Sequence, residues 1–167
     1  LLSEGGMGAV YQALDGNLEM TVALKENFFG VEASKEQFKR EALMLAKLHH
    51  PGLPRVTNHF EEDHRQYLVM DFVEGVDLWE MLKEVKGPLT QQVAIDIVVQ
   101  LCETLTYLHQ QSPPIIHRDI KPQNIKITPN SVYIPSGRYY NSDHCILKDL
   151  NYVKSINRPR FAIIVGS

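Results

Sequence analysis

The stretch from Gln91 to Gln111 most constrains the fold, because its apolar residues recur every three or four positions along its whole length. The pattern stops before Pro113-Pro114, and proline cannot continue a helix. We therefore predict a long helix from about Gln91 to Gln111 whose core stripe consists of Val93, Ile97, Val98, Leu101, Cys102, Leu105 and Leu108.

The residues before this helix favour strands and one shorter helix. Apolar runs around Val10 and Val22 flank a turn-favouring segment at 13–17, which predicts two or three antiparallel strands between residues 1 and 25. Two further strands are predicted at 55–60 and 66–72, followed by a linker at 73–76.

Between the two groups of strands, Ser34 and Gln37 match a capping box, and apolar residues then recur at helical spacing up to His50-Pro51. This pattern predicts a helix over 35–48. A strand-rich first half and a helical second half make the fold class α+β. The predicted core consists of Val10, Val22, Leu24, Phe38, Leu45, Leu48, Leu68, Met70, Leu101, Leu105 and Leu108.

Charge and cysteine content argue against several classes of function. The formal net charge of −3 offers no basic face for nucleic acid, and the histidines are scattered rather than paired at metal-ligand spacing. Cys102 and Cys145 lack C-x-x-C spacing, so neither a disulfide framework nor a cysteine zinc site is indicated, and a reducing cytoplasm fits best. No apolar run reaches the roughly 18 residues that a membrane span needs, so we expect no membrane contact from this segment.

The last residues differ in charge from the rest. Residues 1–135 contain 12 Lys+Arg and 18 Asp+Glu, a net charge of −6, whereas residues 136–167 contain 5 and 2, a net charge of +3. The first residue is a leucine that already looks like part of a strand, so we treat the chain as a fragment.

A glycine-rich turn lies between the first predicted strands. Gly5, Gly6 and Gly8 follow Ser3-Glu4, and glycines allow backbone N–H groups to approach phosphate oxygens without obstruction. A flexible hairpin would give the same pattern, so this signal is weak alone.

Lys25 ends the apolar run that follows, so its ammonium group projects next to the glycine turn, where it could hold a polyphosphate. A solvated surface lysine is the alternative. Glu41, however, falls between Leu45 and Leu48 on the apolar stripe of the 35–48 helix, where an unpaired carboxylate is costly to bury. Lys25 is the natural partner for this charge.

The strongest local signal is the run from His117 to Asn124 after the long helix. Asp119 can accept the proton of an attacking hydroxyl group, and Lys121 can neutralise charge on a transferring phosphoryl group. Asn124 can supply a metal-ligand oxygen. An ordinary polar loop rarely combines these residue types at this spacing.

Taken in order, the glycine-rich turn, Val22-Ala23-Leu24-Lys25, Glu41 and His117-Arg118-Asp119…Asn124 resemble the motifs of the protein kinase family over about residues 1–128. The Gly-Gly-Met-Gly turn and His50-Pro51-Gly52-Leu53-Pro54 are similar to bacterial Ser/Thr kinases of the eukaryotic type.

This resemblance implies a two-lobed fold with an N-lobe at 1–72, a hinge at 73–76, the start of a truncated helical C-lobe at 77–130 and a diverged or misread tail at 131–167. It implies ATP and Mg²⁺ as cofactors and protein Ser/Thr hydroxyls as substrates, with Lys121 marking that specificity. Val10 and Ala23 would cover the adenine ring, Met70 would be the gatekeeper, and Asp71 to Val73 would bind adenine.

The chain departs from the family pattern at two places. Ser3 replaces the first glycine of the turn, which ATP binding should tolerate. The family's metal-binding Asp is expected about a dozen residues after Asn124, yet Val132 to Gly137 contains no acid. Asp149, after the apolar run 146–147, is the better match as metal ligand, provided that a roughly dozen-residue insertion separates two strands.

Three functions remain open at this stage. Transfer of the ATP γ-phosphoryl group to protein Ser or Thr is the leading one, an ATP-binding pseudokinase or regulatory module is the rival, and a small-molecule kinase is the third. We expect the chain as given to have little or no kinase activity and to retain weak nucleotide affinity. The oligomeric state cannot be inferred from the sequence.

Overall fold

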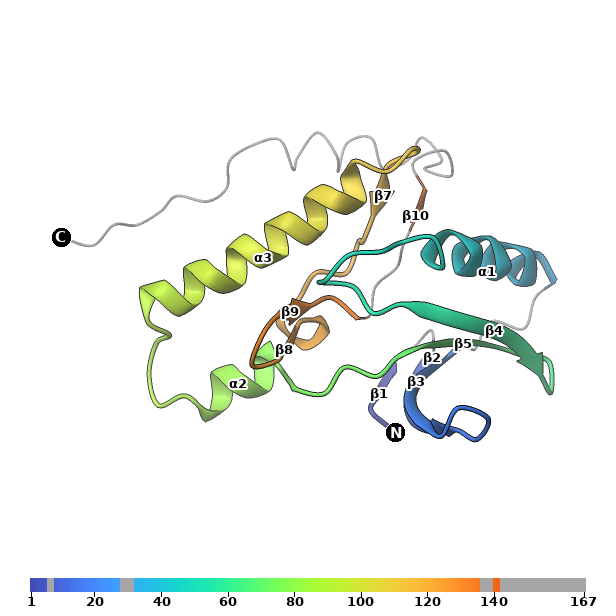
Figure 1. Ribbon diagram of the computed structural model, residues 1–167, viewed down its shortest axis with the longest axis horizontal. Helices are drawn as coiled ribbons and strands as arrows, with labels where there is room; N and C mark the ends of the chain where they lie inside the picture. The colour runs from blue at the N-terminus through green and yellow to red at the C-terminus, as the bar shows by residue number, and fades with distance from the viewer. Residues whose placement is uncertain (6–7, 28–31, 136–139, 142–167) are drawn as a thin grey trace.

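The computed structural model describes residues 1–5, 8–27, 32–135 and 140–141 (Figure 1). A curved antiparallel sheet with one helix forms one part of the molecule, and two helices with short strands form the other. This arrangement confirms the predicted kinase-like α+β architecture. Within the described residues, no helix has the length and apolar character that a membrane span requires.

The sheet has five strands in the order β1-β2-β3-β5-β4, with every neighbouring pair antiparallel. Its strands are β1 Ser3–Gly5, β2 Gly8–Asp15, β3 Met20–Asn27, β4 Val56–Glu62 and β5 Arg65–Asp71. The turn after β2 forms where predicted, because Oδ1 of Asp15 accepts hydrogen bonds from the backbone N–H groups of Asn17 and Leu18.

Helix α1 Glu32–Leu45 begins and ends earlier than the predicted 35–48. Ser34 lies inside its first turn, so the predicted capping box is wrong. The helix ends because the backbone tightens, with the N–H groups of Lys47 and Leu48 donating to carbonyl groups only three residues back. Leu48 nevertheless stays buried beyond the helix end.

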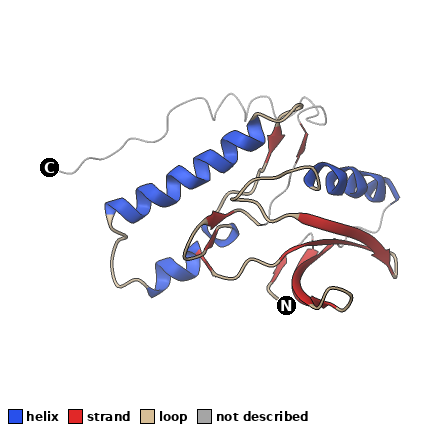
Figure 2. Ribbon diagram, in the orientation of Figure 1, coloured by secondary structure: helices blue, strands red, loops and turns tan. Residues whose placement is uncertain are grey.

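The second part contains α2 Leu78–Glu84 and α3 Gln91–His109 (Figure 2). Helix α2 was not predicted, although Asp77 and Glu80 form a capping box in which each side chain accepts from the other residue's backbone N–H. The remaining elements are short: β6 Val76–Asp77, β7 Ile115–Ile116, the 3-10 turn η1 Pro122–Asn124, β8 Lys126–Ile127, β9 Val132–Tyr133 and β10 Tyr140–Asn141.

Helix α3 matches the predicted long helix, but only part of the predicted stripe is in the core. Ile97 and Leu108 are buried, and Leu101 and Leu105 pack against the core. Val98 is 55% exposed, and Val93 and Cys102 are also exposed. The predicted stripe therefore merged two faces of the helix, because residues one position apart point about 100° away from each other.

The core joins the sheet, α1 and α3. The predicted residues Val22, Phe38, Leu45, Leu48, Leu68, Met70 and Leu108 are buried, and Val10, Leu24, Leu101 and Leu105 are partly buried.

The loop after α1 fastens the two parts together. The ring of His50 stacks on Tyr107 of α3 at 4.9 Å, and the backbone N–H of His49 donates to the Tyr107 hydroxyl at 2.9 Å. The carbonyl of Gly52 accepts from the N–H of Ile134 at 2.9 Å. These contacts set the position of the sheet relative to the segment that follows α3.

Replacement of Leu108 by alanine should destabilise the fold, because this leucine side chain is completely buried between the two parts. We expect a loss of about 3 kcal/mol in the free energy of unfolding, measured by urea denaturation. Leu43→Ala is the control, since Leu43 of α1 is 50% exposed and should cost no more than about 0.5 kcal/mol. Equal losses would contradict the location of the core.

Candidate active site

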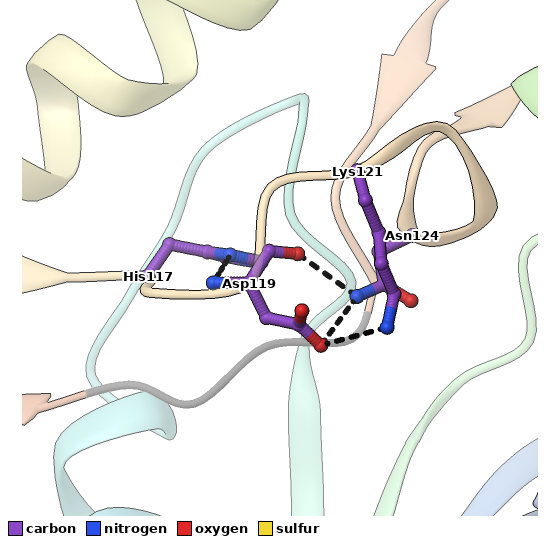
Figure 3. A network of polar contacts seen from close by, with 4 residues as sticks. All are labelled: His117, Asp119, Lys121 and Asn124. Carbon is purple, nitrogen blue, oxygen red and sulfur yellow. Dashed lines mark hydrogen bonds and ion pairs between the residues drawn. The ribbon is translucent and has the colours of Figure 1, made fainter. Parts of the chain in front are cut away.

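The loop between β7 and β8 brings three predicted residues into direct contact (Figure 3). The Nδ2 group of Asn124 donates to Oδ2 of Asp119 at 2.8 Å and to its carbonyl oxygen at 2.9 Å. Nζ of Lys121 lies 3.3 Å from the same Oδ2. The predicted catalytic residues and Asn124 therefore form one cluster.

Local backbone features hold this loop in shape. His117 is buried, and its Nδ1 accepts from the N–H of Asp119 at 3.4 Å. Arg118 has a φ of 59°, a left-handed conformation that is costly for a residue with a side chain. Pro122 starts η1, and the N–H of Asn124 closes that turn on the carbonyl of Lys121 at 2.8 Å. The backbone that carries Asp119 is thus held on both sides, by His117 and by the closed turn η1.

The cluster is suited to proton abstraction. Asn124 and Lys121 both contact Oδ2 of the Asp119 carboxylate, and within the described part of the chain Oδ1 accepts no hydrogen bond. The Asp119 side chain is 38% exposed, so a ligand can reach it. A carboxylate with a fixed orientation and one available oxygen can act as a general base.

Four other predicted residues share one face of the five-stranded sheet. Lys25 is the register partner of Val10, and Ala23 is the partner of Met70. Lys25 and Ala23 are two residues apart on β3, and residues at that spacing point to the same side of a strand. Val10, Ala23, Lys25 and Met70 therefore line a common surface.

Part of this surface is a pocket with an apolar lining. Lys25 is the only charged residue that lines this pocket. The other lining residues are Leu45, Leu48, Leu53, Pro54, Val56, Leu68, Met70 and Pro135. The pocket thus places Lys25 next to the segment that follows β9.

The glycine turn adjoins this face at its edge. Gly5 is the register partner of Gly8, and a Cβ on Gly8 would lie 2.0 Å from the carbonyl oxygen of Glu26. Only glycine fits there without moving the backbone of β3. Gly6 lies outside the described residues.

Glu41 and Lys25 interact electrostatically, as the sequence predicted. Burial in α1 raises the pKa of the Glu41 carboxyl group, and the positive charge of Lys25 opposes this by lowering that pKa. The lysine charge therefore favours the ionised form of a carboxyl group that burial disfavours.

The predicted hinge follows β5. Asp71 ends that strand, its backbone N–H donates to the Arg55 carbonyl at 2.9 Å, and its Oδ2 accepts from the Arg55 N–H at 3.0 Å. Val73 is partly buried just beyond it. This bracing fixes where the chain leaves the sheet for the second part.

The described residues do not complete a Mg²⁺ site. Asn124 uses its amide N–H group on Asp119, so its Oδ1 is the atom left for a metal. The described part of the chain contains no group of three or more His, Cys, Asp or Glu residues that could hold a metal ion. Pro135, which follows β9 beside Lys25, offers no carboxylate.

The insertion that we predicted ahead of Asp149 does not lie between β8 and β9. These strands pair directly, with Ile127 opposite Val132, and Oγ1 of Thr128 accepts from the N–H of Ser131 to close the turn. That part of the prediction is wrong, because the short apolar segment 132–134 already fills the place beside β8. Asp149 itself lies outside the described residues.

Comparisons with known proteins agree with this geometry. The family model of the protein kinase domain matches residues 1–137 of this chain. The serine/threonine-protein kinase PknH of Mycobacterium tuberculosis is 40% identical over 131 residues, which are 77% of this chain and 20% of PknH. The serine/threonine-protein kinase PrkC of Bacillus subtilis is 38% identical over 130 residues, 76% of this chain and 20% of PrkC. The chain thus spans about a fifth of the length of the curated relatives that it matches.

Solved structures show the same similarity. Rad53 residues 1–466 in complex with AMP-PNP superpose with a TM-score of 0.71 at 28% identity, covering 81% of this chain and 36% of that one. The apo form of PpkA-294 gives a TM-score of 0.67 at 26% identity, covering 80% and 55%.

The raised pKa of Glu41 predicts how stability depends on pH. A carboxyl group whose pKa is higher in the folded state binds more protons when folded, so its contribution to stability is lost as the pH rises through that folded pKa. Glu41→Gln removes this dependence, so the variant should gain thermal stability relative to the unaltered chain as the pH rises above the ordinary carboxyl range.

Thermal denaturation across that pH range measures the effect. Glu36→Gln, at an exposed position of the same helix, is the control. If the melting temperatures of both variants matched that of the unaltered chain at every pH, the inference that burial raises the pKa of Glu41 would be incorrect.

Proposed function

Because this chain belongs to the protein kinase family, we propose that it binds ATP and supplies the catalytic loop for phosphoryl transfer to Ser or Thr hydroxyls of proteins. The contact of Asp119 with Lys121 and Asn124 is the observation that carries this proposal. Phosphoryl transfer, protein substrates and Ser/Thr specificity are proposed for the whole protein rather than for this chain alone.

The adenine ring of ATP binds on the shared sheet face in this proposal. Val10 and Ala23 cover the ring, Met70 stands behind it, and the backbone of Asp71 to Val73 hydrogen-bonds its edge. A flat apolar ring suits this surface, because Ala23 and Met70 are buried and opposite each other.

The phosphates extend toward the glycine turn. Backbone N–H groups of Gly5, Gly6 and Gly8 contact them, and Lys25 neutralises part of their charge. Glu41 keeps the Lys25 ammonium in place through the electrostatic interaction described above.

In the transfer step, the substrate hydroxyl attacks the γ-phosphorus and gives its proton to Oδ1 of Asp119. The bond between the γ-phosphorus and the bridging oxygen breaks, and ADP leaves with that oxygen. Lys121 offsets the negative charge on the transferring phosphoryl group, while Asn124 holds the base through Oδ2. Catalysis here rests on positioning and charge stabilisation.

Mg²⁺, when bound, neutralises charge on the β- and γ-phosphates. Among the described residues, Oδ1 of Asn124 is the candidate ligand. We propose Asp149 as the second, with the extra chain length lying after β9 rather than between β8 and β9. An ATP-binding pseudokinase is the second candidate function, and the observation in its favour is that β9 leads into Ile134-Pro135, which carries no acid.

A cytoplasmic location is also proposed, supported by the exposed free thiol of Cys102.

Lys25→Met and Asp119→Asn should produce different defects in the full-length gene product. Loss of the Lys25 charge should weaken ATP binding, measured by calorimetry, because that charge faces the phosphates. Asp119→Asn should leave binding within about threefold and lower phosphorylation of a general Ser/Thr substrate by at least about 100-fold, since a general base contributes that much. Equal losses of ATP affinity in both variants would contradict the role of Asp119.

The role of Asp149 can be tested by the Mg²⁺ dependence of ATP binding in the same protein. If Asp149 is a metal ligand, the increase in ATP affinity caused by Mg²⁺ should be at least about tenfold smaller in Asp149→Asn than in the unaltered protein. Asp143→Asn is the matched control from the same segment. Mg²⁺-independent ATP binding in the unaltered protein would favour the pseudokinase.

A further inference from the structure

Glu26 is a buried carboxylate that the proposed chemistry does not use. It follows Lys25 on β3, faces the opposite side of the sheet, and is only 2% exposed. Burying a carboxylate is costly unless it is paired and hydrogen-bonded, so a charge at this position calls for a reason.

Two side chains from the neighbouring strands hold the Glu26 carboxylate. The hydroxyl of Tyr11 on β2 donates to Oε2 at 2.9 Å, and Nη1 of Arg65 on β5 donates to Oε1. The Glu26 carboxylate in turn raises the pKa of the Arg65 guanidinium group. Each carboxylate oxygen is thus bound by a different strand, and three adjacent strands are tied at one point.

The backbone of Glu26 is also the surface against which the glycine turn rests. Its carbonyl oxygen lies where a Cβ on Gly8 would be, 2.0 Å from that position. Glu26 therefore follows Lys25 in the sequence and packs against Gly8. Both of these residues contact the ATP phosphates in the proposed binding mode.

We propose that Glu26, held by Tyr11 and Arg65, is a positioning residue that sets the distance between the glycine turn and Lys25 for binding the phosphates of ATP. An apolar residue of similar size could fill the same space at lower cost. The carboxylate adds direction, because its two hydrogen bonds allow one position of β2 and β5 relative to β3. This inference rests on the proposed nucleotide binding.

The test compares ATP with adenosine, which lacks the phosphates. Glu26→Gln and Arg65→Gln should weaken ATP binding by about tenfold, the effect of losing a hydrogen bond to a charged group. Adenosine binding should stay within about twofold. Ala23 and Met70 of the adenine surface lie three positions from Glu26 and its register partner Tyr67 along β3 and β5, whereas Lys25 and Gly8 adjoin Glu26 directly. Arg65→Lys, which keeps a cation beside Glu26, should restore most of the ATP affinity.

Two further variants guard against misfolding and against a general charge effect. Tyr11→Phe removes one hydroxyl group and leaves the ion pair intact, so it tests the cluster if Glu26→Gln fails to fold. Glu19→Gln, in the exposed turn between β2 and β3, removes a charge away from the cluster and should change neither affinity. A parallel fall in ATP and adenosine affinity, or a lower melting temperature with unchanged affinities, would mean that the cluster is only structural.

Amide hydrogen exchange without nucleotide separates this inference from the proposed function. Glu26→Gln should speed exchange at Ala9 and Val10 more than at Leu68 of β5. Uniform acceleration across the sheet would overturn the positioning role. If the unaltered chain binds neither ligand, the proposed function fails, and the exchange pattern still decides whether Glu26 orders the glycine turn.

Discussion

The contact between the loop after α1 and helix α3 is the interaction on which the rest of the structure depends. The ring of His50 stacks on Tyr107, and the carbonyl of Gly52 accepts a hydrogen bond from the N–H of Ile134, just after β9. Through these contacts the sheet that carries Lys25 is fixed relative to the loop that carries Asp119. Neither group is useful alone, because phosphoryl transfer requires that the nucleotide and the base be held in one geometry.

Much of the fold could be predicted from the sequence, because its elements follow local rules. The strand pairs and α3 are set by apolar periodicity and by prolines, which act over a few residues. The errors came where local rules compete with tertiary packing. Ser34 looked like a cap, but the helix begins at Glu32. Helix α3 has apolar residues on more than one side, so the sequence could not indicate that Ile97 is buried and Val98 exposed.

The candidate site was predictable to the extent that its residues are close in the chain. Asp119, Lys121 and Asn124 lie within six residues, and the structure brings them into contact. The Lys25 to Glu41 interaction was predictable because a carboxylate on an apolar stripe needs a cation. Glu26 was missed because its partners, Tyr11 and Arg65, come from distant strands whose register no local pattern specifies. The direct pairing of β8 with β9 was missed because each strand has only two residues, too few to show an alternating pattern.

Gly52 has a consequence for how such a chain can vary in evolution. A Cβ at this position would lie 2.1 Å from Oγ1 of Thr104, which is itself fixed by donating to the Gln100 carbonyl at 2.9 Å, and 3.2 Å from the carbonyl oxygen of Val132. Even alanine would act as a wedge between the two parts. The two halves of the molecule therefore cannot vary independently at this junction, because any side chain at 52 requires that the side chain at 104 become smaller or turn away.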